Sequence, residues 1–227
     1  MENETPFSPA DLADLAQVFV RELESRSAVP LGNLTRFTGA GVYAVYYTGA
    51  FPHYATISAR NANGLFVQPI YVGKAIPPGS RKGQRAAETA GVRPDPTSLY
   101  TRLTQHANSI RQVETLDLAD FSCRYRLIEA DWITVAELLL IRHYQPIWNW
   151  VVDGFGLHDP GKGRYEGQRS KWDTIHRGRS WEGKLSQRNP MSETEILARI
   201  EQASREEVRA MLTEYEEMVE ANTDEET

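Results

Sequence analysis

Two apolar runs, Gly41-Val-Tyr-Ala-Val-Tyr-Tyr-Thr48 and Leu65-Phe-Val-Gln-Pro-Ile-Tyr-Val-Gly73, decide the fold of this chain. Both are rich in β-branched and aromatic residues and are bounded by Gly, Pro or Asn, which is the pattern of β-strands. Pro69 has no N–H for a strand ladder, so part of the second run is expected at a sheet edge or a bulge. Residues 122–129 alternate in side-chain character and predict a third strand.

Helical periodicity follows these strands. One helix is expected from Thr97 or Ser98 to about Ile110, with its Leu99, Leu103 and Ile110 facing inward. Residues 133–144 predict a second helix, apolar on most sides and therefore buried. The order strand, strand, helix, strand, helix predicts an α/β (α+β) core, in which helices flank a small three-stranded antiparallel sheet.

Amphipathic helices are expected at both ends of the chain. Ser8-Pro9 is an N-cap followed by proline at the first helical position, and Ser192-Glu-Thr-Glu195 is a capping box that opens a long helix with an acidic tail. We therefore divide the chain into an N-terminal helical extension (1–35), a core (36–150) with a basic insertion (76–97), a basic loop region (151–190) and a C-terminal helix with its tail (191–227). The C-terminal helix fits either a dimer interface or packing on its own core.

The charge of the chain is unevenly distributed. The 227 residues hold 25 basic and 31 acidic side chains, and this net charge of −6 argues against a general nucleic-acid binder. However, residues 1–35 carry 2 basic and 6 acidic side chains (−4), and residues 191–227 carry 3 and 12 (−9). The remaining 20 basic and 13 acidic side chains give residues 36–190 a charge of +7. The objection to DNA binding therefore does not hold for the middle of the chain.

Two stretches of that middle region mix basic residues with prolines or aromatic residues. Such mixtures suit contacts to phosphates and bases, although an ordinary solvated loop has the same composition. The candidate DNA-binding residues are Arg81, Lys82, Arg85, Lys162, Arg164, Arg169, Lys171, Trp172, Arg177 and Arg179.

The remaining composition bears on compartment and cofactors. The single Cys123 excludes an intramolecular disulfide and a multi-thiolate metal site within one chain. No apolar run reaches the length of a membrane span, and the N-terminus lacks the basic start of a signal peptide. We expect a cytoplasmic protein that does not associate with membranes.

Several residues could carry chemistry. Glu137 has almost only apolar neighbours in sequence, and a buried carboxylate needs a cation or a donor, so a metal ion or an arginine is expected beside it; a structural ion pair or a narrow exposed stripe is the alternative. Arg102 and His106 are four residues apart and share a helix face, where they could bind phosphate and move a proton. Tyr43 and Tyr71 each lie near a glycine on a predicted strand, where tyrosines usually serve packing. His158 has no partner at metal-ligand spacing in the sequence.

Taken together and in order, these residues resemble the GIY-YIG nuclease family. The resemblance covers residues 41–149 and rests on Gly41-Val-Tyr43, Tyr71-Val-Gly73-Lys74, Arg102-x-x-x-His106, Glu137 and Pro146-Ile-Trp-Asn149. With the loop Asp153-Gly-Phe-Gly-Leu-His-Asp-Pro160, it narrows to the type II restriction endonucleases that cut the palindrome CCGCGG. One departure is the 28-residue separation of Tyr43 and Tyr71, which is longer than the hairpin usual in the family.

The resemblance implies a Mg²⁺-dependent enzyme that hydrolyses phosphodiester bonds in double-stranded DNA. One carboxylate in the set favours a single metal ion, held by Glu137. Tyr43 is expected to accept or relay the proton of the attacking water, which requires nearby positive charge because a phenol has a pKa of about 10. The other implied roles are phosphate contacts and charge stabilisation by Tyr71, Arg102, His106 and Lys74, and orientation of the site by Asn149. A homodimer on a palindrome and a companion DNA methyltransferase in the host are also expected.

Other functions compete with this interpretation. A repair or mobile-element nuclease with the same core is one, and a DNA-binding protein that has lost catalysis is another. Pro94-Asp95 with Glu182-Gly-Lys184 could be fitted to a different restriction-nuclease motif, but 87 residues separate the two halves and both lie in predicted loops. A helical adaptor without chemistry is the remaining alternative.

Overall fold

The two apolar runs form neighbouring antiparallel strands in the computed structural model, which describes residues 12–76 and 96–206. These strands are β2 (Gly41–Tyr47) and β3 (Pro69–Ala75). Their register shifts between Val45 and Tyr46, opposite the start of β3, and β3 is an edge strand. Both features agree with the position predicted for Pro69.

The sheet has four strands, in the order β1-β4-β2-β3, rather than the predicted three. β4 (Phe121–Leu127) is the expected third strand and pairs with β2 along its length. The additional β1 (Val29–Pro30) pairs antiparallel with β4 through only two residues. A segment this short has no periodicity that a sequence pattern can detect.

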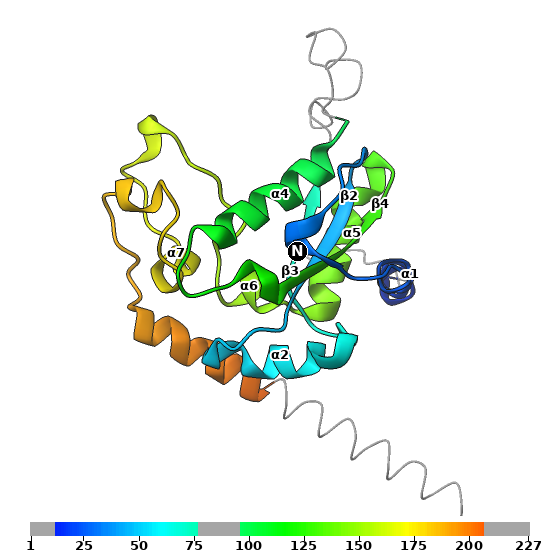
Figure 1. The fold of residues 1–227 in the computed structure, drawn as a ribbon, viewed down its shortest axis with the longest axis horizontal. Helices are drawn as coiled ribbons and strands as arrows, with labels where there is room; N and C mark the ends of the chain where they lie inside the picture. Colours follow the sequence, from blue (N-terminus) through cyan, green and yellow to red (C-terminus); the bar gives the residue numbers. More distant parts are fainter. Residues whose placement is uncertain (1–11, 77–95, 207–227) are drawn as a thin grey trace, which may run out of the picture.

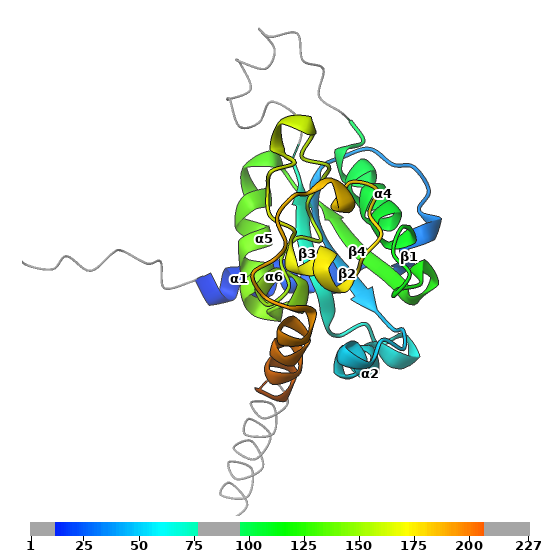
Figure 2. The same cartoon turned by 90° about the vertical axis from the view of Figure 1, so that its left-hand side faces the viewer.

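Helices cover both faces of the sheet, as Figures 1 and 2 show. α4 (Ser98–Arg111) and the short α6 (Ile147–Trp150) lie on one side, and α1 (Leu12–Glu24) and α5 (Ala130–Tyr144) on the other. Because side chains alternate along a strand, Tyr43 and Val45 of β2 enter the core cluster under α4, whereas Val42 and Ala44 enter the one under α5. All seven residues of β2 are buried.

The helix predictions hold for position but not fully for burial. Leu99, Leu103 and Ile110 of α4 are completely buried, as expected. On α5, in contrast, Trp132 and Leu138 are about half exposed, at 49% and 48%. The helix faces the sheet along one side only, so the prediction of a buried helix was too broad. No helix of residues 12–76 and 96–206 combines the length and apolar character that crossing a bilayer requires.

The connection between β2 and β3 contains a helix that the sequence pattern did not predict. α2 (Ala55–Asn61) follows β2 and is drawn in cyan at the lower end of the sheet in Figure 1. The buried Asn61 side chain bonds the Tyr47 carbonyl, the Gln68 carbonyl and the Gln68 N–H, at 3.0, 2.8 and 2.9 Å. The long connection between Tyr43 and Tyr71 is therefore an ordered element tied to the ends of both strands.

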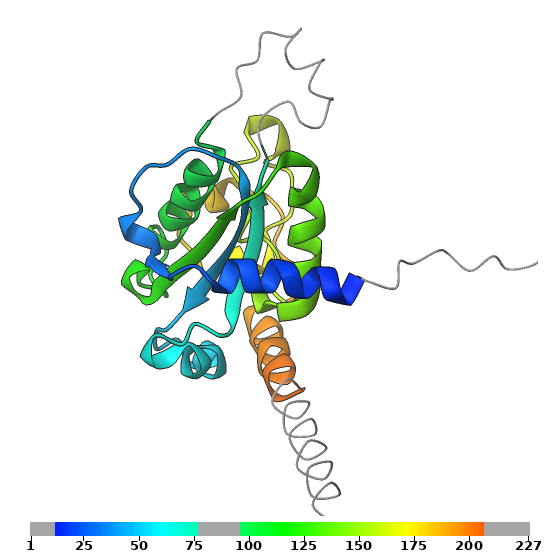
Figure 3. The same cartoon turned by 90° about the vertical axis from the view of Figure 1, so that its right-hand side faces the viewer.

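The terminal additions pack on the same core. α1 crosses beside α5 in Figure 3, and its predicted start at Ser8-Pro9 lies outside the described residues. The capping box is present, because the Ser192 N–H and hydroxyl both donate to Glu195 Oε2 at 2.7 Å. The helix that follows, described for residues 193–206, buries Ile196 and Ile200 in the core cluster under α4. This part of the helix packs on its own core, and residues 207–227 lie outside the description.

The region after Gly154 differs most from expectation, because much of it is packed on the core rather than solvated. It contains the short helix α7 (Lys171–Ile175), and Trp172 and His176 are completely buried. His176 Nε2 lies 2.7 Å from the Tyr54 hydroxyl, and its Nδ1 lies 2.7 Å from the Thr115 hydroxyl. One histidine therefore ties this region to two distant parts of the core.

His176 makes the stability of the fold depend on pH. Burial lowers its pKa from the ordinary 6.5 to about 3. Between these values the unfolded chain binds a proton that the folded chain does not, so stability falls as the pH is lowered, by at most about 1.4 kcal/mol per pH unit. Urea unfolding between about pH 6 and pH 4 should show a steeper loss for the wild type than for His176→Gln. Equal slopes would contradict this assignment.

Candidate active site

A buried tyrosine–histidine pair joins β2 to α4. The Tyr43 hydroxyl lies 2.6 Å from His106 Nε2, and the two side chains are 0% and 1% exposed. Burial raises the pKa of Tyr43 well above its ordinary value, and Arg102 only partly opposes this effect. Burial likewise lowers the pKa of His106 far below its usual range. The pair is therefore a neutral phenol beside a neutral imidazole, and the positive charge expected to lower the Tyr43 pKa does not prevail.

Tyr71 and Arg102 complete this cluster on the α4 side of the sheet. The Tyr71 ring centroid lies 6.2 Å from that of Tyr43 and 5.3 Å from that of His106. Arg102 Nη2 donates to the Gly156 carbonyl at 2.6 Å, and Arg102 Nη1 contacts His158 Nε2. A phenol, a guanidinium and an imidazole thus converge at one place, which is a set suited to binding phosphate and moving a proton.

Gly73 explains why a glycine follows the second tyrosine of the pattern. It pairs across the strands with Tyr43, and a Cβ at Gly73 would lie 2.4 Å from the Tyr43 hydroxyl oxygen. Any larger residue would displace the phenol. The tyrosine of Gly41-Val-Tyr43 and the glycine of Tyr71-Val-Gly73 are therefore the two sides of one cross-strand contact.

Lys74 and Glu137 lie on the other side of the edge strand, between β3 and α5. Lys74 Nζ and Glu137 Oε2 are 2.5 Å apart, and the side chains are 24% and 21% exposed. The structure therefore shows, beside Glu137, the ion pair expected as the alternative to a metal ion or an arginine. The negative charge of Glu137 contributes to the raised pKa of both Tyr43 and Tyr71, so the carboxylate lies within electrostatic range of the cluster.

Asn149 covers the open edge of β3. Its Oδ1 accepts from the Val72 N–H at 2.8 Å, and its Nδ2 donates to the Val72 carbonyl at 2.8 Å. This pair of hydrogen bonds to the backbone between Tyr71 and Gly73 holds the strand that carries both residues. It also satisfies polar groups that an edge strand would otherwise leave unpaired.

Glu137 offers one carboxylate that a hard divalent cation could use. Mg²⁺ is usually bound through one or two carboxylates together with water and substrate phosphate, rather than by an all-protein cage. Glu137 is partly accessible and has one carboxylate to offer. Within residues 12–76 and 96–206, no group of three or more His, Cys, Asp or Glu side chains could hold a metal ion. A metal ion at Glu137 would need water or a substrate to complete its coordination.

The candidate DNA-binding residues separate into four groups. Lys162, Arg164 and Arg177 are exposed, and Arg177 also pairs with Glu182 at 3.1 Å. Arg169 is largely buried and pairs with Glu182 at 3.0 Å, and Lys171 pairs with Asp153 at 3.2 Å. Arg81, Lys82 and Arg85 lie outside the described part of the chain. Trp172 and Arg179 are buried in the protein.

For Trp172 and Arg179 the interpretation as DNA contacts is wrong, because they are 0% and 2% exposed. Arg179 forms an ion pair with the buried Asp173, at 2.6 Å. Spacing along the chain cannot distinguish a buried cation from one on a surface.

Residues of the loop after α6 were not predicted as parts of the site. Phe155 stacks on His106 with a centroid distance of 4.5 Å, and the Gly156 carbonyl and His158 contact Arg102. The sequence offers His158 no partner at metal-ligand spacing. Its partner in the structure is an arginine 56 residues away, which sequence spacing alone does not reveal.

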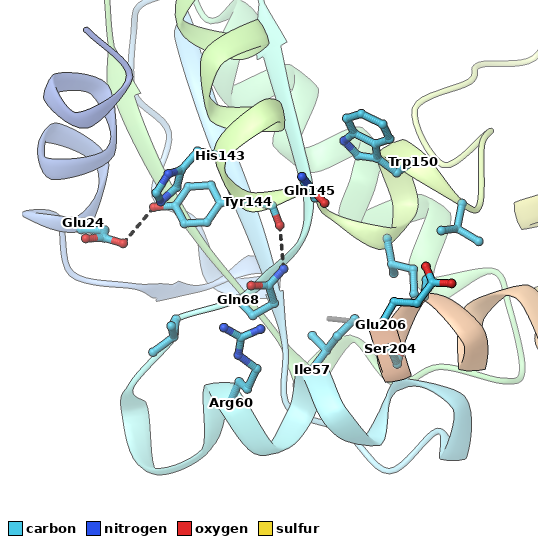
Figure 4. Close-up of a pocket in the computed structure, with 14 residues that line it drawn as sticks. Glu24, Ile57, Arg60, Gln68, His143, Tyr144, Gln145, Trp150, Ser204 and Glu206 are labelled. Atoms are coloured by element: carbon cyan, nitrogen blue, oxygen red, sulfur yellow. Dashed lines mark hydrogen bonds between the residues drawn. The ribbon is translucent and has the colours of Figure 1, made fainter. Parts of the chain in front are cut away.

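The described part of the acidic C-terminal helix lies away from this site. Its Glu201 contacts His53 at 3.0 Å, next to α2, and Figure 2 shows the helix below the lower end of the sheet. A cavity of about 780 Å³ lies between this helix, α2 and the end of α5, and is shown in Figure 4. None of the proposed catalytic residues lines it. The described acidic residues of this helix therefore lie away from the Tyr43–His106 cluster.

One protein family matches most of this chain. The family model of the Eco29kI GIY-YIG domain matches residues 35–204, which is most of the chain. The chain belongs to the Eco29kI GIY-YIG family. This is a family of restriction endonucleases, so the protein is a nuclease. A comparison with curated proteins gives no match.

Membership in this family relates the geometry to a reaction class. The matched residues 35–204 contain the strand pair, both tyrosines, α4, α5 and the loop that follows α6. Restriction endonucleases of the family generally use a divalent metal ion. Glu137 has a partly accessible carboxylate and Arg102 a guanidinium, which are side-chain groups that can bind a metal ion and a phosphate, respectively.

Proposed function

We propose that the protein is a type II restriction endonuclease that cuts double-stranded DNA at a GC-rich palindrome, CCGCGG, with one Mg²⁺ ion per active site. The observation that carries the proposal is the convergence of Tyr43, His106, Tyr71 and Arg102 beside the Lys74–Glu137 pair in a member of this nuclease family. The recognition sequence rests on the resemblance described above. The other parts rest on the chemistry of these side chains.

Tyr43 and His106 activate the attacking water in this proposal. A free phenolate is costly in this buried position, so deprotonation of Tyr43 must be coupled to another transfer. The 2.6 Å contact provides a route, in which Tyr43 takes a proton from water while its own proton passes to His106 Nε2. The water oxygen forms a bond to phosphorus, and the bond from phosphorus to the 3′ oxygen breaks. The resulting imidazolium lies close to the charge that develops on the phosphate.

The other residues bind and stabilise the phosphate. Arg102 keeps its contact with the Gly156 carbonyl and turns its Nη1 group from His158 to a phosphate oxygen, in a charge-assisted bond, and Tyr71 donates a second bond. Glu137 would hold the metal ion, which neutralises charge on the phosphate and the leaving oxygen when bound. Lys74, once released from Glu137, adds positive charge beside the metal ion that Glu137 would hold. Asn149 keeps the edge strand in register.

Both strands of a palindrome require two active sites. We therefore propose that two copies of the chain bind one DNA site with two-fold symmetry. The exposed cations Lys162, Arg164 and Arg177 are candidates for DNA contacts, and Arg or Lys side chains can read guanine in the major groove. A companion methyltransferase in the host would protect the same sequence.

The test is a digest of DNA of known sequence with Mg²⁺, followed by mapping of the ends. Discrete fragments whose ends map to CCGCGG are expected. Fragments at a different palindrome would overturn the recognition sequence but keep the restriction activity. Cutting only at lesions or branched junctions would favour a repair or mobile-element nuclease, and a gel shift without cleavage would favour a DNA-binding protein without catalysis.

A further inference from the structure

A fully satisfied arginine lies at the centre of the region after α6. Arg179 is 2% exposed, and its guanidinium lies between the rings of Trp172 and Trp181, 4.6 and 4.4 Å from their centroids. It contacts Asp173 in a bidentate manner, with Nε to Oδ1 and Nη2 to Oδ2 both at 2.6 Å. This ion pair provides the charge balance that a buried arginine needs.

The remaining guanidinium donors bind backbone of one short loop. Nη2 donates to the Gly154 carbonyl at 3.0 Å, and Nη1 donates to the carbonyls of Phe155 and Leu157 at 3.2 and 3.3 Å. With the two bonds to Asp173, all five N–H groups of the arginine have acceptors. Three of these five fix consecutive or near-consecutive carbonyls, so the conformation of residues 154–157 depends on this one side chain.

This loop contacts three members of the proposed active site. Phe155, which is 1% exposed, stacks on His106 at an interplanar angle of 19° and meets the Tyr71 ring edge-on at 5.0 Å. The Gly156 carbonyl accepts from Arg102. The backbone also approaches Tyr71 closely, because a Cβ at Gly156 would lie 2.6 Å from the Tyr71 hydroxyl.

We infer that Arg179 is a positioning residue for catalysis: it holds the 154–157 loop so that Phe155 orients the His106 ring and Gly156 holds Arg102. The inference rests on the proposed function in so far as it concerns the cleavage rate. Arg179 has no contact with the reacting groups in this arrangement and acts through the loop. A misplacement of about 1 Å at a catalytic group can cost about 100-fold in rate, so loosening the loop should reduce catalysis more than DNA binding.

Two variants separate positioning from folding. Arg179→Lys keeps the charge beside Asp173 but offers three donors in place of five, so the loop carbonyls lose partners. The double variant Asp173→Asn with Arg179→Met removes both charges together and leaves no buried ion unpaired, and the new amide oxygen can still accept from the Ser170 hydroxyl. Leu140→Ala serves as the control, because it creates a cavity in the opposite layer without touching the loop.

Three measurements are needed for each variant: the single-turnover cleavage rate at saturating DNA, the Kd for DNA with Ca²⁺ in place of Mg²⁺, and thermal unfolding. A fourth, made without DNA, is the nuclear Overhauser effect between the ring protons of Phe155 and His106. We expect the folded double variant to cleave about 100-fold slower with a Kd near that of the wild type, and to lose the ring contact. Arg179→Lys should show the same pattern, whereas Leu140→Ala should lose stability only.

A wild-type cleavage rate in either folded Arg179 variant, or an unchanged ring contact, would overturn the inference. If the double variant does not fold, Arg179→Lys decides the question alone. If the wild-type protein cuts no DNA, the proposed function fails, and the ring contact measured without DNA still tests whether Arg179 positions the loop.

Discussion

Replacement of Glu137 by glutamine should lower the rate of DNA cleavage by about 1,000-fold or more at saturating metal ion, with little change in DNA binding. Glutamine has the shape of glutamate and can still accept from Lys74, so the contact between α5 and β3 is retained. The variant lacks the negative charge that would hold a divalent cation. The measurement is the single-turnover rate over a range of Mg²⁺ concentrations, together with a gel shift in Ca²⁺.

Asp131→Asn provides a control for this variant on the same helix. Asp131 is an exposed carboxylate in the first turn of α5, six residues before Glu137. Its replacement should leave cleavage unchanged. Cleavage by Glu137→Gln at the wild-type rate would exclude Glu137 as the metal ligand. Equal losses of cleavage in both variants would show that the negative charge of α5 matters, and not the position of Glu137.

The second large effect is expected for Tyr43→Phe. Removal of the hydroxyl takes away the group that accepts the proton of water, and general acid–base catalysis of this kind contributes about 100- to 10,000-fold to a rate. The variant also leaves His106 Nε2 without its buried partner, which should cost about 1–3 kcal/mol of stability. Cleavage therefore has to be compared at a temperature where the variant is folded.

The chain offers a closely matched control in Tyr54→Phe. Tyr54 is also fully buried, and its hydroxyl also lies beside a histidine, 2.7 Å from His176 Nε2. It also accepts from Trp148 Nε1 at 2.9 Å, so its loss should cost at least as much stability. We expect Tyr54→Phe to cleave DNA normally once folded. If both variants lose cleavage in proportion to stability, Tyr43 has only a structural role.

The predictable part of this fold consists of elements whose side chains repeat with a clear period. β2 is a continuous apolar run, β4 and α4 each place apolar residues on a defined face, and the spacing of Leu99 and Leu103 alone assigns them to the core. The members of the active site are recognisable because the resemblance supplies their order. Their distances depend on the cross-strand register, which no single segment of sequence contains.

Other features depend on tertiary structure alone. β1 exists because two residues meet β4, and α2 is short enough to lack a periodic signal. Arg179 has the sequence context of a solvent-exposed cation because its neighbours in sequence are basic. The opposite charge at Asp173 and the flanking Trp172 and Trp181 are visible in the sequence, but only the folded chain shows that they enclose one guanidinium.

The contact between Tyr43 and Gly73 has a consequence for protein engineering. The requirement lies in the cross-strand register, since the phenol occupies the space that a side chain on the glycine would need. The length of the 48–68 connection does not by itself set this contact, but the connection supplies Tyr54 and Asn61 to the core, so any replacement would have to keep those contacts as well as the strand register. A slip of one position would turn every side chain of β3 to the other face of the sheet and dismantle the catalytic centre. Grafting this centre onto a new scaffold therefore requires, first of all, that the two strands keep their alignment.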